Sequence, residues 1–208
     1  MIWTPDLDIE KELWEGGLRH VAGLDEAGRG ALAGPVAVGA VILPARVTDL
    51  LKELRGVRDS KLMTPLARRR LRPAIEGCAL CWGVGSASAE EIDRMGIAAA
   101  ARLAALRALE GMALPPDFLL TDFRLDLPEV DLPQASLVKG DRKCLSIAAA
   151  SVLAKTWRDE QLNGLDGAFP GYGLARHKGY GTAAHRAAIE QRGYSSAHRR
   201  TFTFKARG

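Results

Sequence analysis

The sequence has 208 residues, of which 47% are hydrophobic and 26% charged, and its net charge is +4. That length suits one domain with a substantial core, and the composition excludes a disordered or collagen-like chain. The longest uncharged stretch, residues 30–45, is short and interrupted by glycine and proline, so we expect no membrane span. The acidic N-terminus lacks the pattern of a signal peptide, which favours a cytoplasmic location.

Basic residues gather at the C-terminus. Residues 176–208 contain eight Lys or Arg against one acid, Glu190, whereas the rest of the chain is mildly acidic. A basic tail on an acidic body is typical of proteins that bind a polyanion, most often nucleic acid. A solvated basic terminus has the same composition, so the charge pattern alone leaves both interpretations open.

The three cysteines are Cys78, Cys81 and Cys144, and an odd number cannot pair completely. This suits a reducing compartment. Cys78 and Cys81 match C-x-x-C, but they begin an apolar run and no second such pair follows. We therefore expect structural cysteines rather than a zinc or redox site.

The first half of the chain predicts strands and one helix. A strand over 20–25 ends in a glycine-rich turn, and the β-branched run over 35–44 is a second strand. Thr64 and Pro65 are a helix cap and a first-turn proline, opening a helix that stops near Gly77. Its arginines at 68, 69, 70 and 72 predict a basic surface, and a third strand follows over 79–87.

The second half alternates strands with helices. A capping box from Ser88 to Glu91 opens one helix that runs to about Leu109. Short apolar runs over 117–122 and 135–139 predict strands on either side of a loop at 124–133. A helix over 146–157 carries small residues and should pack closely on the sheet, and Thr182 caps a last helix. The order predicts an α/β domain with a mixed sheet.

Carboxylates fall at three strand ends. Asp25 and Glu26 close the first strand, Asp122 closes the strand over 117–122, and Asp141 follows the next one. Acids in such positions are often turn or cap residues. Four of them at the ends of strands can also converge on a hard cation, and Mg²⁺ or Mn²⁺ is the natural candidate because both prefer oxygen ligands.

A glycine-rich turn, Gly28-Arg29-Gly30, follows the first acids directly. Its spacing matches a dinucleotide fingerprint, which would make the protein an oxidoreductase. That fingerprint requires a helix, and a strand follows here instead, so this interpretation fails. The turn remains a flexible segment whose backbone can approach a sugar or phosphate closely.

Longer motifs follow one another along the chain. They are Asp25-Glu-Ala-Gly-Arg-Gly30 with Ala-Leu-Ala-Gly-Pro35, Asp59-Ser-Lys61, Glu91-Ile-Asp93, Asp122 at its strand end, Lys139-Gly-Asp141 with Ser146-Ile-Ala-Ala-Ala-Ser151 and Ala154-Lys155, His177-Lys-Gly-Tyr-Gly-Thr182 and His198-Arg-Arg-Thr-Phe202. Together these motifs resemble the signature of bacterial ribonuclease HII, from about residue 20 to residue 202.

The resemblance implies a ribonuclease H-like fold, with a five-stranded mixed sheet flanked by helices and a C-terminal helical extension. We expect one catalytic domain over 1–208, with a core at about 18–163 and a basic substrate-binding extension at about 164–208. It also implies a monomeric endonuclease that cleaves the RNA strand of RNA–DNA hybrids. Such enzymes nick DNA 5′ to a single embedded ribonucleotide and leave 3′-hydroxyl and 5′-phosphate ends.

The resemblance assigns roles to particular residues. Asp25, Glu26, Asp122 and Asp141 correspond to the metal-binding acids, which would hold two Mg²⁺ or Mn²⁺ ions during catalysis. Residues Gly28, Arg29 and Gly30 are similar to the segment that reads the ribose 2′-hydroxyl. Tyr180 resembles the tyrosine that stacks on the next sugar, and Lys61 and Arg29 are the favoured phosphate contacts.

Three residues depart from the family pattern: Phe123 and Gly96 replace the usual glycine and asparagine, and Cys144 the usual serine. None removes a carboxylate. The C-terminal Thr201-Phe-Thr-Phe204 suggests contact with a sliding clamp, with a packed terminus as the alternative. A protein that binds hybrids without cleaving them is the alternative function, but it would have no use for four acids that repel nucleic acid.

Overall fold

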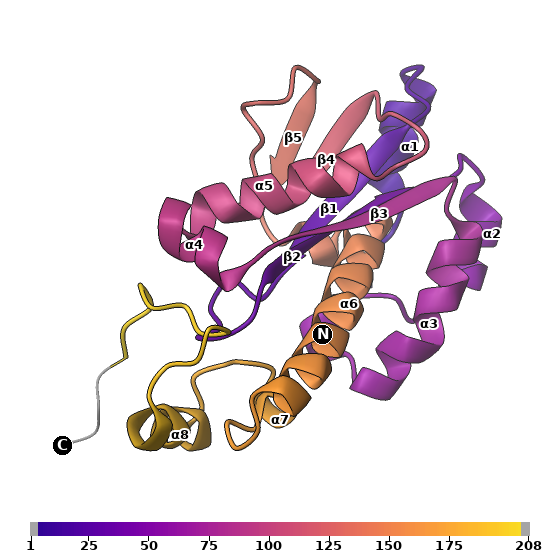
Figure 1. Ribbon diagram of the computed structural model, residues 1–208. Coiled ribbons are helices and arrows are strands. Elements are labelled where there is room, and N and C mark those ends of the chain that lie inside the picture. Colours follow the sequence, from indigo (N-terminus) through magenta and orange to yellow (C-terminus); the bar gives the residue numbers. More distant parts are fainter. Residues whose placement is uncertain (1–3, 205–208) are drawn as a thin grey trace.

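A computed structural model describes residues 4–204 (Figure 1). Its centre is a five-stranded sheet in the order β3-β2-β1-β4-β5. The strands are β1 (Val21–Ala27), β2 (Val36–Ile42), β3 (Cys81–Ala87), β4 (Phe118–Asp122) and β5 (Gln134–Leu137). Strands β1, β2 and β3 pair antiparallel, whereas β4 and β5 extend the sheet in parallel from β1. The predicted mixed sheet is confirmed.

Helices cover both faces of the sheet (Figure 1). One face packs against α6 (Leu145–Ala168), with α1 (Asp8–Glu15), α2 (Val47–Glu53) and α3 (Pro65–Cys78) around it. The other face packs against α4 (Ala89–Met95) and α5 (Ile97–Glu110). Side chains of β2 alternate between two buried clusters, which is why this interior strand is apolar throughout. None of the described helices is long and apolar enough to cross a bilayer.

Small residues let the two long helices approach the sheet closely. A Cβ atom on Gly39 of β2 would lie 2.4 Å from the carbonyl oxygen of Ala150 in α6. On the opposite face, a Cβ atom on Gly85 of β3 would lie 2.1 Å from the carbonyl oxygen of Ala104 in α5. These distances leave no room for a side chain, so the expected close packing of the small-residue helix is confirmed.

Two helices differ in their bounds from the prediction. The single helix expected from Ser88 to about Leu109 is divided, because Gly96 has a φ of 80° that ends α4 and turns the chain into α5. Helix α6 is longer than expected and continues to Ala168, past the predicted core boundary at 163. Helix α3 begins as predicted, since the Thr64 side chain accepts a hydrogen bond from the Ala67 N–H at 3.2 Å.

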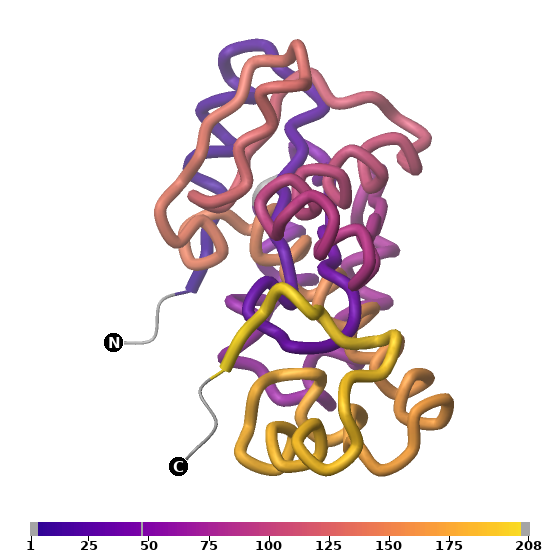
Figure 2. Tube along the Cα trace, turned by 60° about the vertical axis from the view of Figure 1, so that its left-hand side comes forward, coloured from indigo at the N-terminus to yellow at the C-terminus, as the bar shows by residue number. Residues whose placement is uncertain are grey.

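The C-terminal segment turns back to the sheet. After α7 (Leu174–His177) and α8 (Ala183–Arg192), the chain runs beside the loop that follows β1 (Figure 2). The Arg199 N–H donates to the Leu32 carbonyl at 2.9 Å, and the Gly34 N–H donates to the Ala197 carbonyl at 2.8 Å. The extension is therefore joined to the end of β1 that carries Asp25 and Glu26.

Candidate active site

Three of the predicted acids meet where two parallel strands end. Strands β1 and β4 pair with Leu24 opposite Thr121, which places Asp25 beside Asp122. One carboxylate oxygen from each of Asp25, Glu26 and Asp122 lies within 4.8 Å of the others. This carboxylate group is built by the sheet itself, because parallel strands present their carboxyl ends at the same edge.

The carboxylate group is buried at Asp25 and half-buried at Glu26 and Asp122, and two of its oxygens have no hydrogen-bond donor. Asp25 is 1% exposed, and its Oδ1 accepts the Glu26 N–H at 2.8 Å. Within residues 4–204, Asp25 Oδ2 and Glu26 Oε2 are buried without a hydrogen-bond donor. Burial and the charge on Glu26 raise the pKa of Asp25 well above its ordinary value, and burial also raises the pKa of Glu26. Unpaired buried carboxylates are costly, so the donor set fits a divalent cation.

Asp141 lies outside the tight group of three and lines a cleft that Asp122 also lines. The 3₁₀ turn η2 (Gly140–Arg142) carries it, and Asp122 Oδ1 accepts the Gly140 N–H at 2.8 Å. Burial and the neighbouring charge of Asp59 raise the pKa of Asp141 to about 6. The cleft brings Asp122, Asp141 and Lys61 together in about 310 Å³.

Lys61 reaches this cleft from the 3₁₀ turn η1 (Ser60–Leu62). Asp59 caps the turn by accepting the Lys61 N–H at 3.0 Å, and it pairs with Arg142 at 3.2 Å. Burial opposes the charge of Lys61, but Asp25, Asp59 and the other nearby carboxylates outweigh it and raise the lysine pKa. Lys61 therefore remains positively charged beside the acids.

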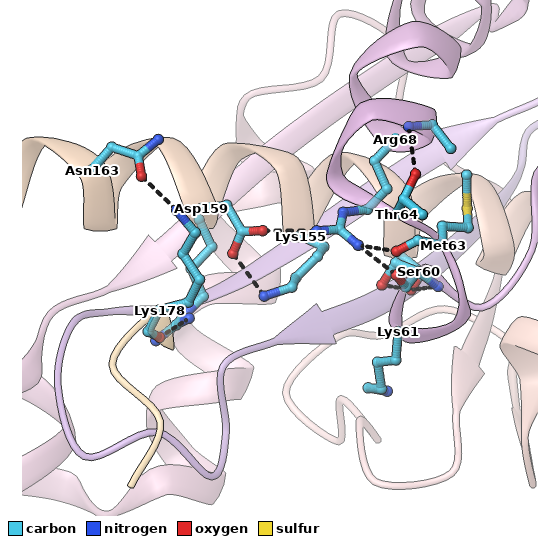
Figure 3. A network of polar contacts seen from close by, with 12 residues as sticks. Ser60, Lys61, Met63, Thr64, Arg68, Lys155, Asp159, Asn163 and Lys178 are labelled. Carbon is cyan, nitrogen blue, oxygen red and sulfur yellow. Dashed lines mark hydrogen bonds and ion pairs between the residues drawn. The ribbon is translucent and has the colours of Figure 1, made fainter. Parts of the chain in front are cut away.

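A buried ion network holds the Lys61 turn against α6 (Figure 3). Arg68 donates to the Ser60 carbonyl at 2.8 Å and to the Met63 carbonyl at 2.7 Å. Its guanidinium pairs with Asp159 at 2.9 Å, and Asp159 pairs with Lys155 at 2.7 Å. The prediction of a basic surface over 68–72 was wrong for Arg68, which is 5% exposed.

Two buried arginines shape the predicted ribose-reading turn. Arg158 donates to three carbonyls, those of Pro35 at 2.8 Å, Lys178 at 2.9 Å and Ala33 at 3.0 Å. Arg199 donates to the carbonyls of Gly34 at 3.0 Å and Arg29 at 2.9 Å. Both guanidiniums are fully buried and the hydrogen bonds that they form go to backbone carbonyls, so they support the backbone rather than bind phosphate.

The turn and Tyr180 lie side by side. Tyr180 forms a β-bridge with Ala31, and its half-buried ring lies 5.5 Å from the Arg158 guanidinium. Gly28 has a φ of 94°, and a Cβ atom there would lie 1.9 Å from Arg158 Nε, so only glycine fits. Gly30 is exposed, and Arg29 lies 3.8 Å from the Glu26 carboxylate while donating to the Arg124 carbonyl at 3.1 Å.

Buried histidines fix the backbone behind Tyr180. The Tyr180 carbonyl can only accept, so the proton of His185 is on Nδ1 at 3.0 Å, and His185 Nε2 accepts from His198 Nε2 at 3.1 Å. The Ser195 N–H and hydroxyl then donate to His198 Nδ1 at 3.1 and 2.8 Å. Burial lowers the pKa of His185 to about 4, so both rings are neutral and the chain of donors runs in one direction.

The sheet order, the helices on both faces and the carboxylates at the ends of β1 and β4 define a ribonuclease H-like fold. The family model described as Ribonuclease HII matches residues 22–205. The chain belongs to the ribonuclease HII family and is a ribonuclease H of type II, as the sequence motifs predicted.

The chain is similar to known ribonucleases H in both sequence and structure. Ribonuclease HII of Dehalococcoides mccartyi strain BAV1 is 52% identical over 198 residues, which cover 95% of this chain and 92% of the relative. Ribonuclease H2 of Pyrococcus horikoshii is 26% identical with a TM-score of 0.70, covering 88% of this chain and 93% of that one. Ribonuclease HII of Archaeoglobus fulgidus, solved in complex with PCNA, is 26% identical with a TM-score of 0.74, covering 91% and 98%.

Proposed function

We propose that the enzyme hydrolyses the RNA strand of RNA–DNA hybrids and nicks duplex DNA 5′ to a single embedded ribonucleotide, leaving 3′-hydroxyl and 5′-phosphate ends. The observation that carries this proposal is the position of the carboxylate group beside the 28–30 turn, with Tyr180 bridged to Ala31 directly after that turn. A cleavage centre next to a sugar-reading turn is what such a reaction needs. We place the enzyme in the cytoplasm, since all three cysteines are free thiols.

Divalent metal is the cofactor that this site would hold. Asp25, Glu26 and Asp122 supply three converging carboxylates with unpartnered oxygens, and Asp141 can complete the set from the wall of the cleft. When bound, Mg²⁺ or Mn²⁺, as a pair of ions, would activate water and stabilise the departing 3′ oxygen. Lys61 adds a fixed positive charge for the phosphate, with Arg29 beside Glu26 as a second contact.

Selection of the ribonucleotide rests on the 28–30 turn and Tyr180. The 2′-hydroxyl is both donor and acceptor, and it is the group that distinguishes RNA from DNA. The two glycines of the turn leave its backbone N–H and C=O groups uncovered beside the carboxylate group, where Arg29 lies next to Glu26. The Tyr180 ring beside it offers a flat face for a sugar without a 2′-hydroxyl.

This function is tested by cutting end-labelled duplexes with Mg²⁺, Mn²⁺ or EDTA. We expect a metal-dependent nick 5′ to one embedded ribonucleotide, and no cut in the all-DNA duplex. Tyr180→Ala should lower nicking at the single ribonucleotide by about tenfold, a loss typical of one stacking contact, with a smaller effect on a continuous hybrid. Tyr180→Phe, which keeps the ring, should retain activity.

Two other outcomes would change the conclusion. If the hybrid is cut but the single ribonucleotide is not, the assignment of the 28–30 turn and Tyr180 as the junction reader is wrong. If a folded, metal-loaded protein binds both substrates and cuts neither, it is a binding protein without catalysis.

A sliding clamp is a proposed partner, because the relative from Archaeoglobus fulgidus was solved with PCNA. In this chain Phe202 packs against the core and lies 5.1 Å from the Arg199 guanidinium. The contact would therefore rest on Phe204 and the residues after it. Deleting residues 203–208 should abolish binding to the clamp while cleavage of a short duplex continues; unchanged clamp binding would refute the contact.

A further inference from the structure

A second hollow adjoins the cleft that holds the acids. The cleft is lined by Asp59, Lys61, Asp122, Phe123, Arg124, Val138, Lys139, Asp141 and Arg142. The adjoining hollow, about 230 Å³, is lined by Val138, Lys139, Arg142 and Lys143. The two share three of these residues, so the surface continues from a mixed acidic and basic cleft into a hollow that contains three cations and no acid.

Two apolar side chains that line the cleft are exposed. Phe123 follows Asp122 directly and is 59% exposed, and Val138, directly after β5, is 54% exposed. Single exposed hydrophobic residues are common on proteins and need no function. Phe123 differs because it lines the same cleft as Asp122, together with several cations.

The cations of the hollow are available for a ligand. Arg142 is paired with Asp59, but within residues 4–204 neither Lys139 nor Lys143 forms an ion pair, and both are exposed. The left-handed backbone at Lys139, with a φ of 56°, starts the turn that also presents Asp141. One turn therefore carries both an acid of the cleft and a lysine of the hollow.

We propose that Phe123, Val138, Lys139, Arg142 and Lys143, which we call the Phe123 rim, hold the substrate duplex on one side of the cut phosphate. The ring of Phe123 packs on the sugar of a nucleotide next to the cleft, and the lysines bind the phosphates beyond it. Nucleic acid fits this surface because its backbone alternates charged phosphates with sugars, and the C–H groups of a sugar can pack on an aromatic ring whatever the sequence. The proposal rests on the proposed function, since it extends the same substrate path.

Steady-state kinetics and salt dependence test the two parts of the rim. Phe123→Ala should raise KM for a ribonucleotide-containing duplex by about tenfold with kcat little changed, and Phe123→Tyr should restore it. Leu66→Ala removes an apolar side chain on α3 that is even more exposed than Phe123; it is the control and should have no effect. Lys143→Ala should lower the slope of log affinity against log salt by about 0.9, the value for one lost phosphate contact.

Fluorescence gives a readout that does not depend on cleavage. With Phe123→Trp in an Asp25→Asn background, adding duplex should change emission, whereas Leu66→Trp in the same background should report no change. Unchanged KM in Phe123→Ala together with unchanged emission would overturn the proposal, even in an enzyme that cuts normally. An enzyme that cuts nothing while the emission still responds to duplex would refute the proposed function and support the rim.

Discussion

Replacement of Asp25 by asparagine is expected to lower the rate of cleavage on the order of a thousandfold while it stabilises the metal-free protein. The rate falls because Asp25 is one of the three converging carboxylates, and bound metal supplies several kcal/mol to the transition state. Stability rises because Asp25 is 1% exposed and lies beside Glu26, so its charge is unfavourable without metal. Each unit by which its pKa is raised corresponds to about 1.4 kcal/mol.

The two effects are measured separately. Cleavage of a labelled hybrid gives the rate, and thermal unfolding in EDTA should show a Tm that is higher in Asp25→Asn by about 2–4 °C for each kcal/mol gained. Asp131→Asn, an exposed acid in the loop before β5, is the control and should change neither quantity. A variant with wild-type activity, or one with a lower Tm in EDTA, would contradict a metal-binding role for a buried, unpaired Asp25.

The stability of the metal-free protein should also depend on pH, because the pKa values of these carboxyl groups are raised by folding. A carboxyl whose pKa is raised on folding favours the folded state below its unfolded pKa, and that contribution disappears as the pH rises through the folded value. For Asp141 this contribution to stability is lost between about pH 4 and pH 6. The pKa values of Asp25 and Glu26 are also raised, so their contributions are likewise lost as the pH rises. The difference in stability between Asp25→Asn and the wild type in EDTA should therefore grow with pH and shrink when metal is added.

Loss of Arg158 is expected to destabilise the fold by roughly 3–5 kcal/mol. Arg158→Ala leaves the carbonyls of Pro35, Lys178 and Ala33 without their donor, and hydrogen bonds to a charged group are worth about 1.5–3 kcal/mol each. Part of this loss is offset because the variant no longer buries a charged guanidinium. Urea unfolding measures the loss. Limited proteolysis should show new cleavage near residues 178–181, because this side chain joins them to the loop after β1.

Two control variants separate the loss of the Arg158 hydrogen bonds from the general effect of removing a positive charge. Arg158→Lys retains one donor and should recover part of the lost stability. Arg70→Ala removes an exposed arginine from α3 and should shift stability by less than about 0.5 kcal/mol. If Arg158→Ala unfolds at the same urea concentration as the wild type, the three carbonyls do not depend on its guanidinium.

The sheet and its acids were predictable because both leave local signals. A buried strand is visible in the sequence as a short run of apolar residues, and Asp25 and Asp122 are charged residues at the ends of such runs. The break at Gly96 was missed because Ser88–Leu109 is helix-forming on both sides of it, and a glycine within such a run is compatible with either outcome.

The arginines that support the site were harder to predict. Arg68 was expected on a basic surface, although its spacing to Leu71 and Ile75 places all three on one buried helix face, a signal that was present in the sequence. Arg158 and Arg199 bind carbonyls more than 100 residues away in the chain. Such partners depend on tertiary contacts, and no local pattern indicates them.

The residues of the candidate site lie partly on strands and partly on turns. Asp25, Glu26 and Asp122 lie on β1 and β4, in the interior of the sheet, where both neighbouring strands and both helical layers restrict movement. Lys61, Asp141 and Tyr180 lie on turns joined to that frame through side chains such as Arg68 and Arg158. Amide hydrogen exchange should therefore be slowest at the proposed metal ligands and faster at the proposed substrate contacts. The positions of the three carboxylates would be set when the chain folds, and the turns would adapt to different duplexes.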